Sequence, residues 1–357
     1  MLARAGIIGP GGAGSLHADA LRRIGVAVRG VAAVSPDVAR RDAERLGLDR
    51  AYASVDELVA SAEVDVVHVC SPNALHLAHC RAALEAGKHI VAEKPLTTSV
   101  REAEELLSLA EDVGVVHALC HTYRYYPMVQ ALRAVAAGGQ LGHVHTIHGT
   151  WLAEELLGID PEHWMLDRRQ MGPALSLADV GVHWWDLVEH VTRSAVSDVI
   201  CETRARRPNA RGGEDTAVFV LRLEGGAIAT GVVCQAAPGH TNTVTLELIG
   251  DRAAAAWDIR SADQLVVREL SGRQRVLQRG TAPVEALGVG ARLPPGHPEG
   301  HADALRELLS RVYEHIGRGY PARGHPTFVD GLRGLRVLEA LSTSARTTRW
   351  TAVSTGC

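Results

Sequence analysis

Short apolar runs alternate with amphipathic stretches along the first third of the chain. The apolar runs have the length and the Val, Ile and Ala content of buried strands: Arg4–Ile8, Val28–Val34, Val64–Val69, His89–Ala92 and Val115–Leu119. In the stretches between them, apolar residues recur at helical spacing, within 15–23, 36–46, 74–86 and 99–113. Strands that alternate with helices in this way predict a doubly wound parallel sheet, an α/β domain.

The pattern changes beyond residue 121. Apolar and polar residues alternate at a strand period in five further runs: Ala217–Leu223, Ala227–Cys234, Thr243–Ile249, Ala254–Ile259 and Gln264–Glu269. Helices are expected at Pro127–Ala137, Ser176–Val191, Glu299–Ile316 and Thr327–Thr343, and an irregular Gly/Pro-rich stretch at 279–300. We therefore predict two domains, 1–121 and 122–357, the second an α+β domain built on a large, mostly antiparallel open sheet.

Composition and charge exclude several classes of protein. At 357 residues the chain is too long for one ordinary core, and its formal net charge of -4 does not favour a nucleic-acid partner. The longest apolar runs, such as Val64–Cys70, fall far short of the roughly 20 residues of a membrane span. The N-terminus enters a predicted strand almost at once, with no targeting region. We expect a cytoplasmic protein with no membrane or nucleic-acid partner.

Cysteine and histidine give no strong indication of a metal. The six cysteines, of which Cys357 is the last, show no C-x-x-C spacing, as expected for reduced thiols of a cytosolic protein. Among 18 histidines, His143, His145 and His148 lie close together in the sequence. No nearby Cys or carboxylate completes a ligand set there, so we expect exposed or hydrogen-bonded histidines and no metal site.

A glycine-rich segment follows the first predicted strand and begins a helix. Gly9-Pro10-Gly11-Gly12-Ala13-Gly14 satisfies G-x-G-x-x-G in the strand–turn–helix context that gives this motif its value. Gly9 permits the tight turn, Gly11 lets backbone approach a pyrophosphate, and Gly14 allows close packing of helix on strand. The free N–H groups of the helix N-terminus favour phosphates. The motif predicts a Rossmann dinucleotide-binding domain, with Gly9, Gly11, Gly12, Ala13 and Gly14 as cofactor-binding residues.

The end of the second predicted strand bears on the choice between NAD and NADP. An acidic residue at this position would bind the ribose hydroxyls of NAD and repel a 2′-phosphate. Ser35 stands there instead, followed by Asp37, Arg40 and Arg41. The arginines could accept a phosphate or form a solvated helix face. We expect NAD, with Ser35 at the cofactor, and leave NADP open.

Two groups of polar residues have the chemistry of proton transfer. Glu93-Lys94-Pro95 follows an apolar strand, at the edge where open α/β sheets bind ligands, although a surface Glu-Lys pair would look the same. Asp179 and His183 are spaced i and i+4 on a predicted helix, where a carboxylate can orient an imidazole. Their spacing alone also fits an ordinary helix-face pair.

Taken together, these motifs resemble those of the glucose–fructose oxidoreductase/inositol dehydrogenase/MocA-like (Gfo/Idh/MocA) oxidoreductase family. The resemblance covers nearly the whole chain and rests on motifs in the family's order: the glycine segment, Ser71-Pro72-Asn73, Glu93-Lys94-Pro95, Tyr123-Arg124-Tyr125-Tyr126-Pro127 and Asp179-x-x-x-His183. Softer matches are Gly296-His297-Pro298 and the stretch from Pro326 to Gly331.

The resemblance implies a role for each matched residue. His183 would be the general acid/base on a substrate hydroxyl, Asp179 would orient it, and Lys94 would hydrogen-bond the same oxygen. Further cofactor-binding positions are implied at Ser71, Asn73, His76, Glu93, Lys94, Arg124 and Trp164. Substrate-binding positions are implied at Lys94, Tyr123, Arg124, Asp179, His183, Gln235, Asn242 and His297.

The resemblance implies an NAD(P)-dependent dehydrogenase that acts reversibly on a secondary ring hydroxyl of a sugar, glycoside, aminoglycoside or cyclitol, and a homodimer or homotetramer. Two alternatives stay open: an NAD-dependent glycosidase that uses transient redox chemistry, and a non-catalytic NAD-binding sensor. The chain departs from relatives at Met165 and Leu175, where they often carry arginine. The loss of both guanidinium groups indicates a less anionic substrate, either cationic or bulkier.

Overall fold

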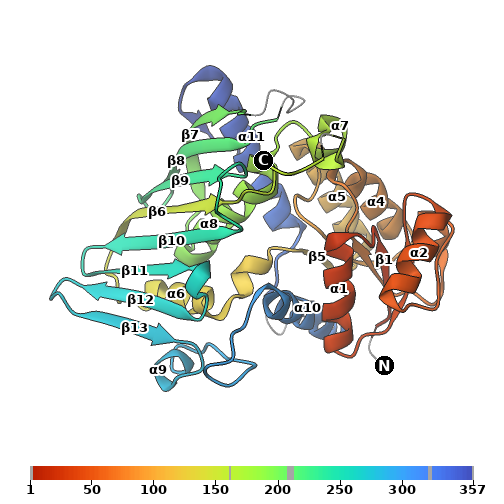
Figure 1. Ribbon diagram of the computed structural model, residues 1–357, viewed down its shortest axis with the longest axis horizontal. Coiled ribbons are helices and arrows are strands. Elements are labelled where there is room, and N and C mark those ends of the chain that lie inside the picture. Colours follow the sequence, from red (N-terminus) through yellow and green to blue (C-terminus); the bar gives the residue numbers. More distant parts are fainter. Residues whose placement is uncertain (1–2, 161, 207–212, 321–323, 356–357) are drawn as a thin grey trace. The chain divides into compact units, whose positions relative to one another are not determined.

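The computed structural model describes residues 3–160, 162–206, 213–320 and 324–355 and divides into two compact units (Figure 1). The first unit holds residues 3–122 with Arg169–Gly172 and Leu305–Leu335. The second holds Tyr123–Arg168, Pro173–Ala304 and residues 336–355, within those described. Cys357 lies outside the described residues, and the other five cysteines are free thiols.

The first unit contains a parallel sheet of five strands. The strands are β1 (Ala5–Ile8), β2 (Val28–Ala32), β3 (Val66–Val69), β4 (His89–Ala92) and β5 (His117–Leu119). Their order is β2-β1-β3-β4-β5, and every neighbouring pair is parallel. Strands β1 and β3 are buried along their whole length, which explains why their residues are apolar except for His68 of β3. The doubly wound parallel sheet predicted from the sequence is confirmed.

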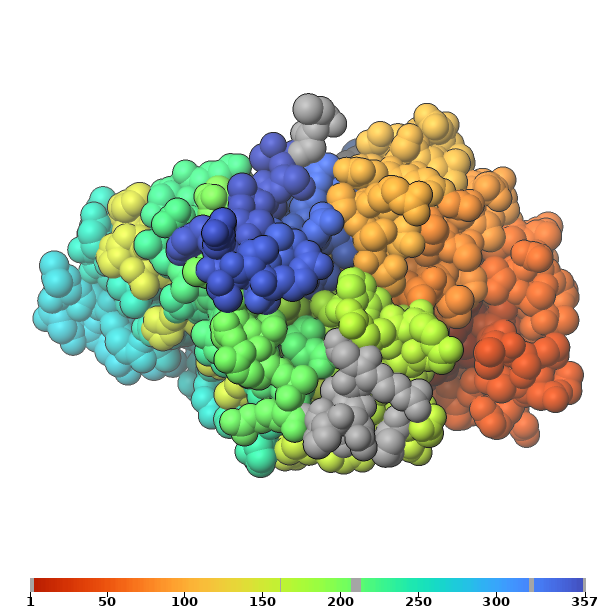
Figure 2. Space-filling model, turned by 90° about the horizontal axis from the view of Figure 1, so that it is seen from above, coloured from red at the N-terminus to blue at the C-terminus, as the bar shows by residue number. Residues whose placement is uncertain are grey.

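Helices connect these strands, and residues of this unit form the red-to-orange surface in Figure 2. They are α1 (Gly12–Arg23), α2 (Pro36–Leu46), α3 (Val55–Ala60), η1 (Asn73–Leu75), α4 (His76–Glu85) and α5 (Val100–Val113). Serines cap three of them: the hydroxyls of Ser35, Ser54 and Ser99 accept from backbone N–H groups in the first turns of α2, α3 and α5. The polar residue before each apolar stripe therefore sets where the helix begins.

The second unit contains a sheet of nine strands in the order β13-β12-β11-β10-β6-β9-β8-β7-β14. The strands are β6 (Val144–Leu152), β7 (Val196–Arg204), β8 (Thr216–Leu223), β9 (Ile228–Cys234), β10 (Thr243–Gly250), β11 (Ala253–Asp258), β12 (Gln264–Glu269), β13 (Gln274–Gln278) and β14 (Thr351–Ala352). Neighbours are antiparallel except β6 and β9, which are parallel. This confirms the predicted large, mostly antiparallel sheet.

Helix α6 (Pro127–Ala137) and helix α8 (Val182–Thr192) pack against this sheet. Trp184 of α8 is fully buried, and its ring lies edge-on to Phe219 of β8. Two glycines of the sheet make room for it, because a Cβ on Gly149 or on Gly231 would lie 3.0 Å from the Trp184 ring. Small residues on the strands thus let the helix approach closely. Within the described ranges, no helix combines the length and apolar character needed to cross a bilayer.

Four strands were not predicted from the sequence: β6, β7, β13 and β14. In β6 the polar residues His145 and His148 fall on exposed positions, and the strand's apolar signal is diluted. The helix predicted at Ser176–Val191 is also not uniform, since it begins as a π-helix, η4 (Leu177–Gly181), before α8. The stretch 279–300 is mostly irregular as expected, but contains the short helix α9 (Ala282–Glu285). The closing helices are α10 (His301–Arg318) and α11 (Phe328–Thr347).

Candidate active site

The glycine segment between β1 and α1 has the backbone that the motif requires. Gly9 has a φ of 81°, and a Cβ there would lie 2.7 Å from the carbonyl carbon of Cys70. At Gly14 a Cβ would lie 2.4 Å from the Gly9 carbonyl oxygen, so only glycine fits at either position. A Cβ on Gly11 or Gly12 would meet no atom within 4 Å. The start of α1, with Ala13 in its first turn, is therefore tightly packed at Gly9 and Gly14 and open at Gly11 and Gly12. A pyrophosphate site requires both features.

Residues beyond β2 shape the position expected for the ribose. The Ser35 hydroxyl accepts a hydrogen bond of 3.3 Å from the backbone N–H of Val38, as the N-cap of α2. Arg40 forms an ion pair with Asp37, while Arg41 is exposed. Ser35 can still donate its hydroxyl proton to a ligand, because the cap uses only its oxygen lone pair.

The loops after β3 and β4 are joined by a histidine. Both ring nitrogens of His76 lie 2.8 Å from carbonyl oxygens, Nε2 from that of Ser71 and Nδ1 from that of Pro95. Burial lowers the pKa of His76, while these two carbonyls oppose that shift. The Asn73 amide donates to the carbonyl oxygen of Met171 over 3.2 Å. His76 thus links the loop after β3 to the segment that carries Lys94.

Glu93-Lys94-Pro95 follows β4, and the Lys94–Pro95 peptide is cis. The Glu93 carboxylate lies 3.1 Å from the His17 ring through Oε1 and accepts from the Lys94 backbone N–H over 3.1 Å through Oε2. Burial would raise the pKa of Glu93, but the hydrogen bond and charge of His17, together with the charge of Lys94, lower it to about 2. Glu93 is therefore not the freely solvated partner of a surface Glu-Lys pair.

The predicted absence of a metal stays a prediction. Across the described residues, one group of potential ligand atoms lies within 4.8 Å of one another, on His17, Glu93 and Cys120. These atoms already contact each other, with Cys120 Sγ 3.6 Å from His17 Nε2. Of the three histidines clustered in the sequence, His143 precedes β6 and the other two lie on it, where His148 pairs with Glu247 across the sheet at 2.9 Å.

In the second unit, Asp179 is held by a buried amide. Asp179 lies in the π-helix η4, and its Oδ2 accepts from Nε2 of Gln235 over 2.8 Å. The same Gln235 nitrogen donates to Glu155. Gln235 is fully buried, and its backbone N–H donates to the carbonyl oxygen of Asp215 over 2.9 Å. The wide π-turn and this fixed donor set the direction of the Asp179 carboxylate, and such turns often occur at functional sites.

His183, in the first turn of α8, is 7% exposed and packed between two aromatic rings. Its ring lies nearly parallel to that of Trp151 at 5.3 Å and 5.0 Å from that of Tyr123. The Tyr123 hydroxyl accepts from the Asn242 amide over 3.2 Å, and burial raises its pKa to about 12. The structure therefore gathers Tyr123, His183 and Asn242 through direct contacts.

The remaining predicted residues have other contacts. Arg124 forms a two-pronged ion pair with Asp186, in which Nε lies 2.9 Å from Oδ2. Trp164 is half-buried in the short helix η3 (Trp164–Leu166), beside the ring of His163. His297 is exposed, and its carbonyl oxygen accepts from Arg279. The assigned functions of these three residues stay predictions.

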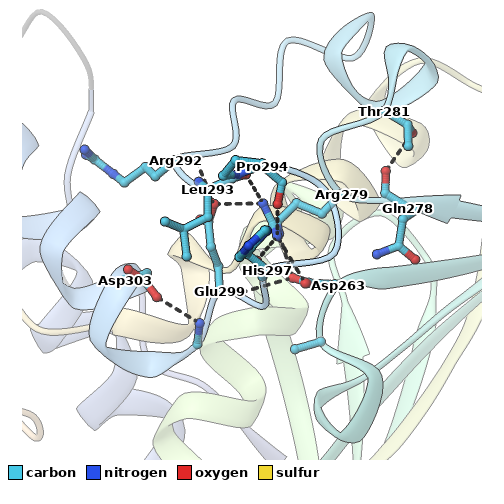
Figure 3. A network of polar contacts seen from close by, with 12 residues as sticks. Asp263, Gln278, Arg279, Thr281, Arg292, Leu293, Pro294, His297, Glu299 and Asp303 are labelled. Atoms are coloured by element: carbon cyan, nitrogen blue, oxygen red, sulfur yellow. Dashed lines mark hydrogen bonds and ion pairs between the residues drawn. The ribbon is translucent and has the colours of Figure 1, made fainter.

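Arg279 is fully buried at the centre of a polar network (Figure 3). Its guanidinium donates to Asp263 over 2.7 Å and to Glu299 over 2.9 Å, and also to carbonyl oxygens of Leu293 and His297. One side chain thus ties the loop that carries His297 to the end of β13. Sequence reasoning missed this residue, because an isolated arginine in a polar stretch carries no signal.

Asp186 and Glu155 were also missed. Asp186 stands within an otherwise apolar helical segment, and a carboxylate in such surroundings signals a buried partner, here Arg124. Glu155 follows β6, a strand that was not predicted, so its position near Gln235 could not be foreseen.

Comparisons with known proteins agree with the fold of this chain. The model of an oxidoreductase family with an NAD-binding Rossmann fold, GFO_IDH_MocA, matches residues 3–121, and that of the GFO/IDH/MocA C-terminal domain matches residues 129–256. The levoglucosan dehydrogenase of Pseudarthrobacter phenanthrenivorans is 25% identical over 352 residues, which cover 90% of this chain and 88% of that protein.

Solved structures resemble the chain over its whole length. An inositol dehydrogenase homologue from Azotobacter vinelandii in complex with NAD+ has a TM-score of 0.92 and 27% identity, covering 99% of this chain and 97% of that one. The complex of an inositol dehydrogenase homologue from the same organism with NADH and myo-inositol has a TM-score of 0.90 and 26% identity, with coverages of 99% and 98%.

Proposed function

The chain belongs to the GFO/IDH/MocA family of oxidoreductases, and from this we propose that it reversibly oxidises a secondary ring hydroxyl of a sugar, glycoside, aminoglycoside or cyclitol. When bound, a nicotinamide dinucleotide supplies the hydride acceptor. The observation that carries the proposal is the fixed pair of proton-handling groups in the second unit, where Gln235 holds Asp179 and aromatic rings pack His183.

Each catalytic residue has a distinct role in this proposal. His183 takes the proton from the substrate hydroxyl during oxidation and returns it during reduction. Asp179 orients the imidazole and favours its charged form, while the Lys94 ammonium hydrogen-bonds the substrate oxygen and lowers the cost of its alkoxide character. The burial of His183 supports this role, because a packed ring keeps its direction through the reaction.

The cofactor groups of the proposal lie on the first unit. Gly11 and Gly12 leave open the start of α1 for the pyrophosphate, Ser35 offers a hydroxyl to the ribose, and Ser71, Asn73, His76 and Glu93 follow the next strands. We prefer NAD over NADP because Arg40 is already paired with Asp37, which weakens its attraction for a 2′-phosphate. Arg124 and Trp164 complete the proposed cofactor set.

The charges around Gln235 support a substrate that is not anionic. The Gln235 amide nitrogen donates to two carboxylates, those of Asp179 and Glu155, and both of these charges raise the pKa of Tyr123. Met165 and Leu175, where the resemblance to the family implies arginine, carry no charge. A cationic amino sugar or an aminoglycoside would meet favourable charges here, with Tyr123, Asn242 and His297 as further contacts.

We also propose that the protein forms a homodimer or homotetramer through the exposed face of the nine-stranded sheet. Val218, Ile228 and Val276 point outward from three strands of this sheet and are 51%, 46% and 51% exposed. Apolar side chains repeated along one sheet face are typical of an association surface. Sedimentation of the purified protein tests this, and a monomer at all concentrations would contradict it.

The function is tested by following the reduction of NAD and NADP against a panel of neutral sugars, cyclitols, amino sugars and sugar acids. We expect reduction of NAD with a neutral or amino-bearing ring and little with sugar acids. Glycoside cleavage without net change in NADH absorbance would favour a redox-assisted glycosidase instead. Cofactor binding with no turnover of any compound would favour a sensor.

A further inference from the structure

A chain of three buried polar side chains continues from Glu93 within the first unit. His17 of α1 is fully buried and lies 3.1 Å from Glu93 through Nε2. Its other ring nitrogen, Nδ1, lies 2.7 Å from Nδ1 of His68, in the middle of β3. The chain continues from Nε2 of His68 to the Tyr313 hydroxyl of α10 over 3.0 Å. All four residues belong to the first unit.

The facing nitrogens restrict where protons can lie. Two Nδ1 atoms 2.7 Å apart must hold one proton between them, since two lone pairs or two N–H groups would repel. Glu93 as a carboxylate can only accept, so His17 Nε2 carries a proton that it donates. His17 is then either neutral, with the shared proton on His68, or an imidazolium that donates from both nitrogens.

The surroundings favour the imidazolium. The carboxylate of Glu93, 3.1 Å from His17 Nε2, stabilises a positive charge on His17, and the pKa of His17 is raised well above its ordinary value although burial opposes this shift. Burial and the charge of His17 lower the pKa of His68 well below its ordinary value. Charged His17, neutral His68 and ionised Glu93 form a consistent set, in which His68 donates from Nε2 to Tyr313.

We propose that His17 is a positioning residue for the Glu93-Lys94 segment. As an imidazolium supported by His68, it holds Glu93 as a carboxylate, and Glu93 in turn fixes the backbone N–H of Lys94. The importance of Lys94 rests on the proposed function, whereas the charges of His17 and Glu93 do not. A packing role alone would need neither the second histidine nor the hydroxyl of Tyr313 at the end of the chain.

Other charged groups near Glu93 are consistent with this role. Lys94 lowers the pKa of Glu93, and the charge of Glu93 acts in turn on His76 and on the thiols of Cys70 and Cys120. The Cys120 thiol stays protonated, because burial raises its pKa to about 12. His17 thus faces Glu93 from α1, while the backbone N–H of Lys94 faces the other carboxylate oxygen.

The protonation states of His17 and His68 can be observed directly. In protein labelled with 15N at histidine, we expect both ring nitrogens of His17 and only Nε2 of His68 to carry protons near neutral pH. Assignments come from the His17→Asn and His68→Gln variants. A neutral His17 with the shared proton on His68 Nδ1 would overturn the proposal. So would a stoichiometric bound metal that is lost in His17→Asn.

Two substitutions separate charge from packing. The amide of His17→Gln can reach Glu93 as an uncharged donor, whereas that of His17→Asn is too short and leaves the carboxylate with the Lys94 backbone N–H but without the donor from α1. Without its cation, Glu93 has a raised pKa, so the acid limb of the pH profile of kcat/KM should move to higher pH by about one unit or more in His17→Asn. We expect an intermediate shift in His17→Gln.

The control is His145→Gln, at an exposed position on β6, which should leave the profile unchanged. Superimposable acid limbs for wild type and His17→Asn would overturn the positioning role. If the wild-type protein turns over no compound of the panel, the pH dependence of NADH affinity is measured in place of kcat/KM. The NMR experiment still determines whether His17 is charged.

Discussion

Gln235 donates a hydrogen bond from Nε2 to Oδ2 of Asp179 over 2.8 Å. The donor cannot swing away, because Gln235 is fully buried and its backbone is tied to Asp215. One oxygen of the proposed orienting carboxylate is therefore fixed, and this fixes the direction of the other. Positioning contacts of this kind around a reactive group commonly change activity without touching the substrate.

Replacing Gln235 by Leu should lower kcat by roughly 10- to 100-fold, since Asp179 loses the donor that orients it. Steady-state kinetics with the best substrate of the panel measures the effect. NADH affinity should be unchanged, because the glycine segment lies in the other unit. An unaltered kcat would show that Asp179 needs no support from Gln235.

The glycine segment predicts opposite effects at two positions. Gly14→Ala places a Cβ 2.4 Å from the Gly9 carbonyl oxygen, so we expect a loss of stability of about 1–3 kcal/mol. Gly11→Ala meets no protein atom and should fold normally, but its methyl group occupies the space proposed for the pyrophosphate. NADH affinity should then fall by about tenfold or more.

Thermal melting and NADH fluorescence titration distinguish the two glycine variants. Normal cofactor affinity in Gly11→Ala would mean that the dinucleotide does not approach this turn. A normal Tm in Gly14→Ala would mean that the helix can shift away from the strand at little cost.

The network around Arg279 predicts a large loss of stability. Arg279→Met leaves the carboxylates of Asp263 and Glu299 without their cation, at positions where their side chains are 17% and 4% exposed. Stranding a buried partner in this way costs about 3–5 kcal/mol. Urea denaturation measures it, and Arg260→Met, which breaks an exposed pair with Asp258, should have no measurable effect.

The pair of Arg4 and Asp65 predicts a pH dependence of stability. The hydrogen bond from Arg4 lowers the pKa of Asp65 from 3.8 to about 2, against the effect of burial. The carboxylate therefore binds protons less readily in the folded state, and its contribution is present above about pH 4 and lost as the pH falls to about 2. In urea denaturation, wild type should be more stable than Asp65→Asn at pH 6, and the difference should shrink through this window. An equal difference at all pH values would contradict the assignment.

The sequence predicted the parallel sheet well, because its central strands are buried and read as short, mostly apolar runs. It was less informative for the second unit. Strand β6 has a mixed sequence with two exposed histidines, yet it lies at the centre of the sheet between β10 and β9. Backbone pairing with these distant strands holds it there, and no local pattern records such pairing.

The predicted site shows the same division. The motifs predicted Gly9 to Gly14, Lys94, Asp179 and His183 as site residues, which stays a prediction, and the resemblance to the Gfo/Idh/MocA family that rested on them is confirmed. The sequence did not reveal which side chains contact these residues. Gln235 was named without its contact to Asp179, and His17 was not named at all, because a histidine in an amphipathic helix looks like any polar position until its buried neighbours are known.

The proposal is tested most directly by comparing wild type and His183→Ala in NAD reduction with the substrate panel. We expect wild type to form NADH with a neutral or amino-bearing ring compound. His183→Ala should reduce kcat by about a hundredfold or more and leave NADH affinity unchanged, since only the proton acceptor is removed. Full turnover by His183→Ala, with cofactor binding intact, would contradict the assignment of His183 as the acid/base.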